Sequence, residues 1–239
     1  MLSNIFAKPH TDTQTQKLYR SMSRIMIALA KIPQPRIGTW TIDDKGHISL
    51  SNRPLLIYLH QLENCGVPAG ISFRNRTYTT GDSFSSDLLA GHDNRLQDQV
   101  NAIFNEEDGQ AQAKDLVLMR ALHHFSGDRH GPFVMQLTDL HASNIFFDQD
   151  WNIKYVIDLE WACSLPTENL QVPWWLTGKA VDEIQTDLES FESCYKKFID
   201  AFEQEESSMA LHYNDSLSSH ALTMRRALEN GQYWYLLAL

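Results

Sequence analysis

Apolar residues recur every three or four positions along much of the chain, the spacing of one face of an α-helix. Between residues 13 and 32 the repeat consists of Leu18, Met22, Ile25, Met26, Leu29 and Ile32. The prolines of the following "IPQPRIG" cannot continue a helix. Similar patterns predict helices over residues 82–104, 106–125, 181–205 and 217–237, and "RPLLIYLHQLENCGVP" predicts a shorter one. We therefore expect a mainly helical chain.

Short runs of β-branched and aromatic residues interrupt these helices and predict small hairpins. "GTWTIDDKGHISLS" places two such runs around a turn at residues 43–46, where Gly46 suits a positive φ. "PFVMQL", "NIFFD" and "NIKYVID" are three more strand-like runs, and the polar "DQDWN" separates the last two. The expected fold class is α+β, with hairpins at about 36–53 and within about 132–163.

Length and composition indicate a folded globular protein. A chain of 239 residues with 43% hydrophobic content can bury a sizeable core. The formal net charge of −10 argues against a surface that binds nucleic acid. No apolar run approaches the roughly 20 residues of a membrane helix, and the N-terminus lacks the pattern of a signal peptide. We expect a cytoplasmic protein that binds neither nucleic acid nor membrane.

The three cysteines do not suggest a disulfide framework or a metal site. Cys65, Cys163 and Cys194 are odd in number and far apart in the chain. Neither a disulfide scaffold nor a paired zinc ligand set has such spacing. We expect reduced thiols that are mostly buried.

Candidate chemistry lies in "TDLHASNIFFDQDWNIKYVIDLEW", which contains Asp139, Asn144 and Asp158. A hairpin folded about Trp151 pairs positions whose numbers sum to about 302, which predicts Asn144 and Asp158 side by side. Asp139 lies five residues before Asn144, so we expect all three side chains to converge. Carboxylate and amide oxygens are ligands that Mg²⁺ prefers, and a nearby carboxylate can accept a hydroxyl proton. This combination is suited to phosphoryl transfer.

"LTDLHASNIFFDQDWNIKYVIDLEWACSLP" resembles the catalytic core of the aminoglycoside phosphotransferase and choline-kinase-like family, especially its fungal branch of uncharacterised members. In that family H-G-D-x-x-x-x-N carries the catalytic Asp and a Mg²⁺-binding Asn, and a later I-D-x-E carries the second metal ligand. The resemblance implies that Asp139 is the catalytic base, that Asn144 and Asp158 bind Mg²⁺, and that ATP is the phosphoryl donor. Leu137 and Thr138 replace the usual His and Gly.

The resemblance extends in weaker form along the chain. "RIGTWTIDDKGHISLSNRPL" is similar to a hairpin that such proteins insert, and "VPWWLTG" resembles the segment after the metal aspartate. It implies that residues 1–239 form a single kinase-like domain equivalent to the C-terminal lobe, with a hairpin insertion at about 36–53 and a catalytic region at about 132–163.

The ATP-covering N-terminal lobe is expected to be absent or truncated. The 11 glycines never lie closer than four positions apart, so the chain has no G-x-G phosphate loop. No lysine before Asp139 sits in a strand-like run followed by a helical Glu. Both features normally hold the phosphates of ATP in a protein kinase.

These observations favour an ATP- and Mg²⁺-dependent phosphotransferase that acts on a small-molecule hydroxyl and is incomplete or weak in this chain alone. The alternative from another class is a non-catalytic, pseudokinase-like module that binds a protein partner. His141, two residues after Asp139, leaves a metal-dependent hydrolase as a third reading. The sequence does not specify the acceptor, because pocket shape rather than a motif selects it.

Other polar and aromatic positions have structural explanations. Glu160 would share a strand face with Asp158, where a catalytic role and a supporting or structural role are both open. His123 and His124 end a predicted helix, where a cation suits the dipole. Trp174 and Trp175 fill the core or line a substrate pocket, and "EQEE" at residues 203–206 is expected to be a solvated helix face.

Overall fold

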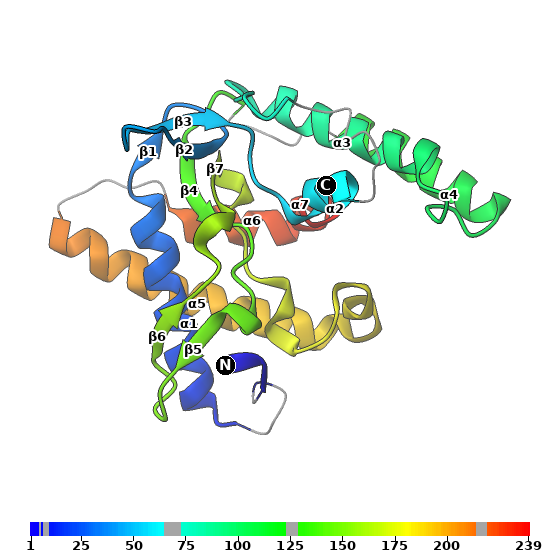
Figure 1. Ribbon diagram of the computed structural model, residues 1–239. Helices are drawn as coiled ribbons and strands as arrows, with labels where there is room; N and C mark the ends of the chain where they lie inside the picture. The colour runs from blue at the N-terminus through cyan, green and yellow to red at the C-terminus, as the bar shows by residue number, and fades with distance from the viewer. Residues whose placement is uncertain (5, 7–9, 65–72, 123–128, 214–218) are drawn as a thin grey trace. The chain divides into compact units, whose positions relative to one another are not determined.

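The structure is a computed structural model that describes residues 1–4, 6, 10–64, 73–122, 129–213 and 219–239 (Figure 1). It is a mostly helical α+β protein with small antiparallel sheets, as the sequence predicts. The chain divides into two compact units. The first contains residues 1–31, 139–160 and 170–233, and the second contains residues 32–138, 161–169 and 234–239. No helix within the described ranges is long and apolar enough to cross a membrane.

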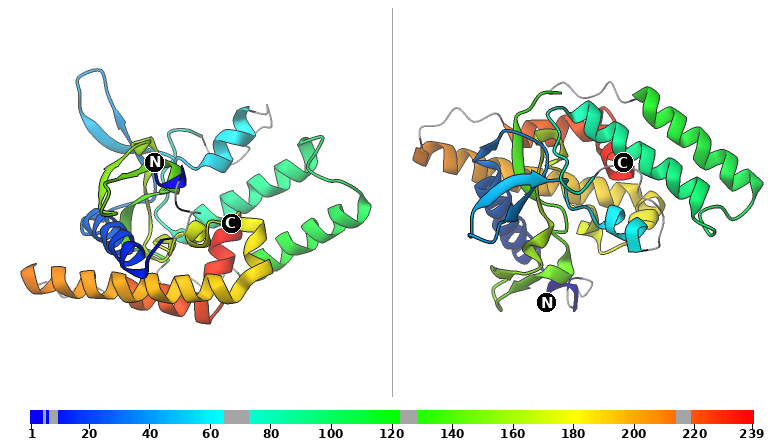
Figure 2. Two further views of the ribbon diagram at one scale, coloured as in Figure 1. Left: turned by 90° about the horizontal axis from the view of Figure 1, so that it is seen from below. Right: turned by 45° about the horizontal axis from the view of Figure 1, so that its top comes forward.

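The first unit is organised around two helices, α1 (Asp12–Ala30) and α5 (Leu188–Tyr213), which pack side by side (Figures 1 and 2). A capping box begins α1: the Gln14 N–H donates to Thr11 Oγ1 at 3.2 Å, and the Thr11 N–H donates to Gln14 Oε1 at 2.8 Å. The facing surfaces are mainly apolar, with Tyr19 of α1 against Phe198 of α5 at 5.3 Å between ring centroids. The periodic pattern thus predicted α1 and the burial of Leu18, Met22 and Met26. Ile25 and Leu29 are only partly buried, and Ile32 lies beyond the helix and is 66% exposed.

Shorter elements complete the first unit. The 3-10 helices are Leu2–Asn4, Ala142–Asn144, Trp174–Thr177 and Val181–Asp187, and the strands are β5 (Ile145–Phe147) and β6 (Ile153–Val156). The helix predicted over 181–205 therefore begins as a 3-10 helix. The helix predicted over 217–237 is two helices, α6 (His220–Glu229) in the first unit and α7 (Gln232–Ala238), most of which belongs to the second unit. They are separate because the chain turns at Gly231 with a φ of 82°.

Two buried carboxylates correct the expectation of a solvated acidic face at residues 203–206. Glu205 is 3% exposed and pairs with Arg20 and Arg24 of α1. Glu206 is 7% exposed and accepts hydrogen bonds at the N-terminus of α6. The sequence interpretation was wrong at these two positions because their partners lie elsewhere in the chain. Glu203 and Gln204 are exposed as expected.

The second unit contains a three-stranded antiparallel sheet in the order β1 (Pro33–Gln34), β4 (Phe133–Leu137) and β7 (Ala162–Pro166). The sequence patterns predicted β4 but neither β1 nor β7. The hairpin β2 (Thr39–Ile42) and β3 (Ile48–Asn52) confirms the turn predicted at residues 43–46, with Gly46 at a φ of 81°.

The helices of the second unit are α2 (Ile57–Asn64), α3 (Gly81–Asp98) and α4 (Glu106–Leu122), with a 3-10 helix at Thr167–Asn169. α3 and α4 form a helical hairpin (Figure 2). α3 ends at Asp98, with Gln99 as its C-cap, rather than at the predicted residue 104. The core of the second unit includes the buried residues Ile37, Leu59, Leu62, Tyr78, Phe84, Leu88, Phe133, Cys163 and Leu165.

Candidate active site

The candidate residues lie in the segment 139–160, which connects the paired strands β4 and β7. β4 pairs with β7 from Phe133–Pro166 to Leu137–Ala162. One residue further, the Thr138 N–H donates to the Trp161 carbonyl oxygen at 3.1 Å, and the Thr138 hydroxyl donates to the same oxygen at 2.9 Å. The two ends of the excursion over 139–160 are thereby held together. A threonine side chain does here what a glycine could not, and the sequence pattern did not predict this role.

Asp139 and Asn144 are joined directly. The Asn144 amide nitrogen donates to Asp139 Oδ2 at 2.8 Å and to the Asp139 carbonyl oxygen at 3.0 Å. Because a carboxylate can only accept, these contacts fix which end of the amide faces Asp139. The side-chain oxygen of Asn144, Oδ1, lies on the other side of the amide and accepts from the Ser143 hydroxyl at 3.2 Å. Asn144 is 4% exposed, so burial holds this arrangement in place.

The hairpin of β5 and β6 carries the chain from Asn144 to Asp158. Its turn is closed by the carboxylate of Asp148, which accepts from the N–H groups of Asp150 and Asn152, both at 3.0 Å. Trp151 occupies the turn with a φ of 66°, which is rare for a bulky residue. Its ring is 5% exposed and packs against Phe147 at 5.4 Å, so burial holds the strained conformation.

The register of this hairpin corrects the predicted pairing by one residue. Ile145 pairs with Val156, and the Ile157 N–H donates to the main-chain carbonyl oxygen of Asn144 at 3.0 Å. Asn144 therefore lies opposite Ile157, and Asp158 is the next residue along. The pairing sum near 302 was one too large because the turn is asymmetric and a bulge lies beside it, between Phe146 and Phe147.

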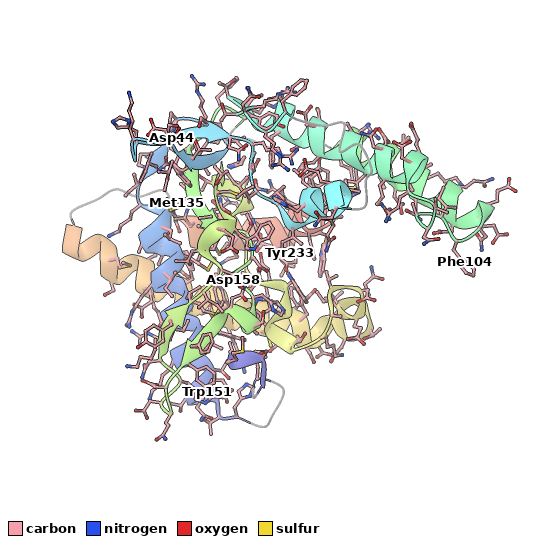
Figure 3. The ribbon with its side chains drawn as sticks, in the orientation of Figure 1. Asp44, Phe104, Met135, Trp151, Asp158 and Tyr233 are labelled. Atoms are coloured by element: carbon pink, nitrogen blue, oxygen red, sulfur yellow. The ribbon has the colours of Figure 1, made fainter. Side chains whose placement is uncertain are left out.

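Asp158 lies at the open end of the hairpin, at the opposite end from Trp151 (Figure 3). Its backbone has a φ of 59°, which takes the chain out of the strand. Aspartate tolerates this left-handed conformation better than most residues do. The side chain is exposed, and its carboxylate makes no hydrogen bond or ion pair with any described residue. The structure thus brings Asp139 and Asn144 into contact. Asp158 directly follows Ile157, the residue opposite Asn144, and its carboxylate has no partner among the described residues.

Aromatic side chains support the loop from Asp139 to Asn144. The Trp175 indole N–H donates to the Leu140 carbonyl oxygen at 2.9 Å, and Trp175 is buried. The His141 ring lies 5.4 Å from that of Trp174, which is only partly buried. Trp175 is therefore a core residue that also fixes the loop. Trp174 is partly exposed and lies beside the His141 ring.

His141 has a local structural role. Its Nδ1 accepts from the Ser143 N–H at 3.3 Å and caps the 3-10 helix that ends at Asn144. Among the residues that the structure describes, no group of three or more His, Cys, Asp or Glu side chains is placed to hold a metal ion. The hydrolase reading, which needs such a ligand set, gains no support from this geometry.

The remaining sequence predictions have mixed outcomes. Glu160 lies in a 3-10 helix at Leu159–Trp161, so the argument from a shared strand face is wrong for it. Cys163 is buried, and burial raises the pKa of its thiol to about 12. Cys194 is partly buried. Cys65, His123 and His124 lie outside the described residues.

Comparisons of the chain with protein-family models, with curated proteins and with solved structures found no match.

Proposed function

We propose that the chain has the architecture of a kinase-like C-terminal lobe and that its site transfers the γ-phosphoryl group of ATP to the hydroxyl of a small molecule. The observation that carries the proposal is the hydrogen bond from the Asn144 amide to the Asp139 carboxylate. It fixes a carboxylate and an amide oxygen in one partly buried loop, five residues apart. Positioning of this kind supplies much of the catalysis in phosphoryl transfer.

Asp139 is the proposed catalytic base. One of its carboxylate oxygens is held by Asn144, and the carboxylate makes no ion pair with any described cation. It can therefore orient an acceptor hydroxyl and receive its proton as the hydroxyl oxygen bonds to the γ-phosphorus. The bond from that phosphorus to the bridging oxygen breaks in the same step, and ADP leaves.

Asn144 and Asp158 fit a Mg²⁺ ion by the chemistry of their donor atoms. The Asn144 amide nitrogen is already used by Asp139, so its carbonyl oxygen is the atom available for a metal. The unpaired Asp158 carboxylate supplies a second hard oxygen from the end of the hairpin. When bound, Mg²⁺ neutralises charge on the phosphate groups. The hairpin register and the left-handed backbone of Asp158 determine where this second donor lies.

The test is phosphoryl transfer from ATP to a panel of small hydroxylated acceptors, measured as ADP release with Mg²⁺ present. We expect Asp139→Asn to lower turnover by about 100-fold or more, because it removes the proton acceptor. Asp150→Asn is the matched control, since Asp150 is an exposed carboxylate in the hairpin turn. Equal rates for wild type, Asp139→Asn and Asp150→Asn would refute the catalytic role.

Metal binding is tested separately through thermal unfolding. Mg²⁺ that binds the folded state should raise the melting temperature of the wild type. We expect Asp158→Ala to lose that increase and Asp150→Ala to keep it. A similar response from both variants would show that Asp158 is not a metal ligand.

A non-catalytic module that binds a protein partner is the second candidate. The observation that favours it is a run of exposed apolar side chains, Tyr155, Ile157 and Leu159, that flanks Asp158. Exposed apolar residues at alternate positions often mark a surface that a partner covers. Absence of turnover together with an unchanged melting temperature in Mg²⁺ would favour this candidate.

A further inference from the structure

The second unit contains a partly open cavity of about 310 Å³ that has no part in the proposed phosphoryl transfer. Its lining comes from α2, α3 and the residue that caps α3: Tyr58, Gln61, Leu62, His92, Arg95 and Gln99. The volume is that of a site for a small organic molecule. Among the residues that the structure describes, the lining contains one permanent cation and no carboxylate.

One wall of the cavity is a rigid aromatic stack. The rings of Tyr58 and His92 lie 4.5 Å apart between centroids at an interplanar angle of 17°. His92 Nε2 donates to the main-chain oxygen of Leu239 at 3.1 Å, which holds the imidazole in place. Burial lowers the pKa of His92, so the ring is neutral near pH 7. The stack therefore provides a flat, uncharged surface for a ligand.

A hydrogen bond to α4 holds the guanidinium group of Arg95 in place. Its Nη2 donates to Gln112 Oε1 at 2.5 Å. The Gln112 amide nitrogen is itself bonded to the Ala102 carbonyl oxygen and to Asp108 Oδ2, both at 3.0 Å. Arg95 is thus held in one orientation, and it forms no ion pair with any described carboxylate. Its Nε is buried and has no hydrogen-bond partner.

Tyr58 presents a second donor with no acceptor. Its hydroxyl oxygen is buried and also lacks a partner. Burial raises the pKa of Tyr58, and the charge of Arg95 together with a contact between the two side chains opposes part of that rise. The hydroxyl is therefore protonated at neutral pH and able to donate. Two buried donors at one cavity are costly for the free protein, and a ligand oxygen that accepts from both would remove that cost.

We propose that this cavity is a binding site for a small organic oxyanion, a carboxylate or a phosphate monoester on a compact flat body. The oxyanion accepts hydrogen bonds from Arg95 Nε and the Tyr58 hydroxyl, and the flat body lies against the Tyr58–His92 stack. A planar guanidinium group suits both kinds of oxyanion. Leu62 supplies apolar contact, and no described residue of the lining carries a carboxylate.

Calorimetric titration of the full chain, without nucleotide or metal, tests the site independently of the proposed phosphoryl transfer. The probes are benzoate and phenyl phosphate, with benzyl alcohol as the neutral probe of similar shape. We expect one or both anions to bind and benzyl alcohol to bind at least about tenfold more weakly, the change expected for one lost charged hydrogen bond. The anion that binds more tightly shows whether the cavity prefers a carboxylate or a phosphate monoester.

Two variants locate the binding. Tyr58→Phe removes only the unpartnered hydroxyl, so we expect it to keep its stability and to lose roughly tenfold in anion affinity. Arg95→Gln should lose more, because it also removes the charge. Tyr155→Phe, an exposed tyrosine of the first unit, is the control and should bind as the wild type does. Absence of binding by both anions at millimolar concentration, or wild-type affinity in Tyr58→Phe and Arg95→Gln, would overturn the proposal.

Discussion

Glu206 offers a sharp test of how the first unit is held together. Its carboxylate, carried by α5, accepts from the His220 N–H at 2.7 Å, from the Ser219 hydroxyl at 3.0 Å and from the Ala221 N–H at 3.4 Å. His220 and Ala221 are both buried, so water cannot replace the carboxylate. A negative charge at this position also interacts favourably with the dipole of α6.

The expected cost of Glu206→Ala follows from these contacts. The short bond from His220 is charge-assisted, and leaving its buried donor without an acceptor costs about 1.5–3 kcal/mol. The bond from Ala221 is at the limit of hydrogen-bond geometry and adds little. Loss of the charge near the helix terminus adds about 0.5–1 kcal/mol. We therefore expect the free energy of unfolding to fall by about 2–4 kcal/mol, and by about 1–2 kcal/mol for Glu206→Gln, which keeps one acceptor oxygen.

Urea unfolding followed by circular dichroism measures these changes as shifts of the midpoint at constant slope. Glu203→Ala and Glu203→Gln are the matched controls, because Glu203 lies on the same helix and forms an exposed ion pair with Arg225 at 3.0 Å. Such a pair contributes at most about 1 kcal/mol. If the Glu206 and Glu203 variants lost the same stability, the carboxylate of Glu206 would not be the cap of α6.

Two further predictions concern the hairpin that leads to Asp158. Trp151→Gly relieves a left-handed backbone worth about 1–2 kcal/mol but removes a buried indole worth about 3–5 kcal/mol, so urea unfolding should show a net loss of about 1–4 kcal/mol; a stabilised variant would contradict this balance. The N–H of Asn152 is the first of the hydrogen bonds that lower the pKa of Asp148 from 3.8 to about 2. The stability that the ionised Asp148 carboxylate contributes to the folded protein should be complete above about pH 4 and disappear as the pH falls toward 2. NMR titration of the Asp148 carboxyl should give this low pKa, and a value near 4 would refute the turn contacts.

The sequence alone predicted the features that depend on neighbours along the chain. The apolar repeat of residues 13–32 predicted α1 because helical periodicity is a local property. The same holds for the turn at Gly46 and for the contact of Asp139 with Asn144, which are separated by only five residues. Local signals are also weak at boundaries, and Gly231 divided a helix that the pattern had joined.

The tertiary structure decided what depends on partners far away in the sequence. β1 is a strand because Gln34 pairs with Phe133, and no local pattern carries that information. Glu205 looks like part of a solvated acidic run until Arg20 and Arg24, more than 180 residues earlier, neutralise it in the folded chain. The unpartnered donors of Tyr58 and Arg95 likewise become a cavity lining only once α2 packs beside α3. Burial changes the meaning of a polar residue, and burial is set by the packing of distant segments rather than by the local sequence.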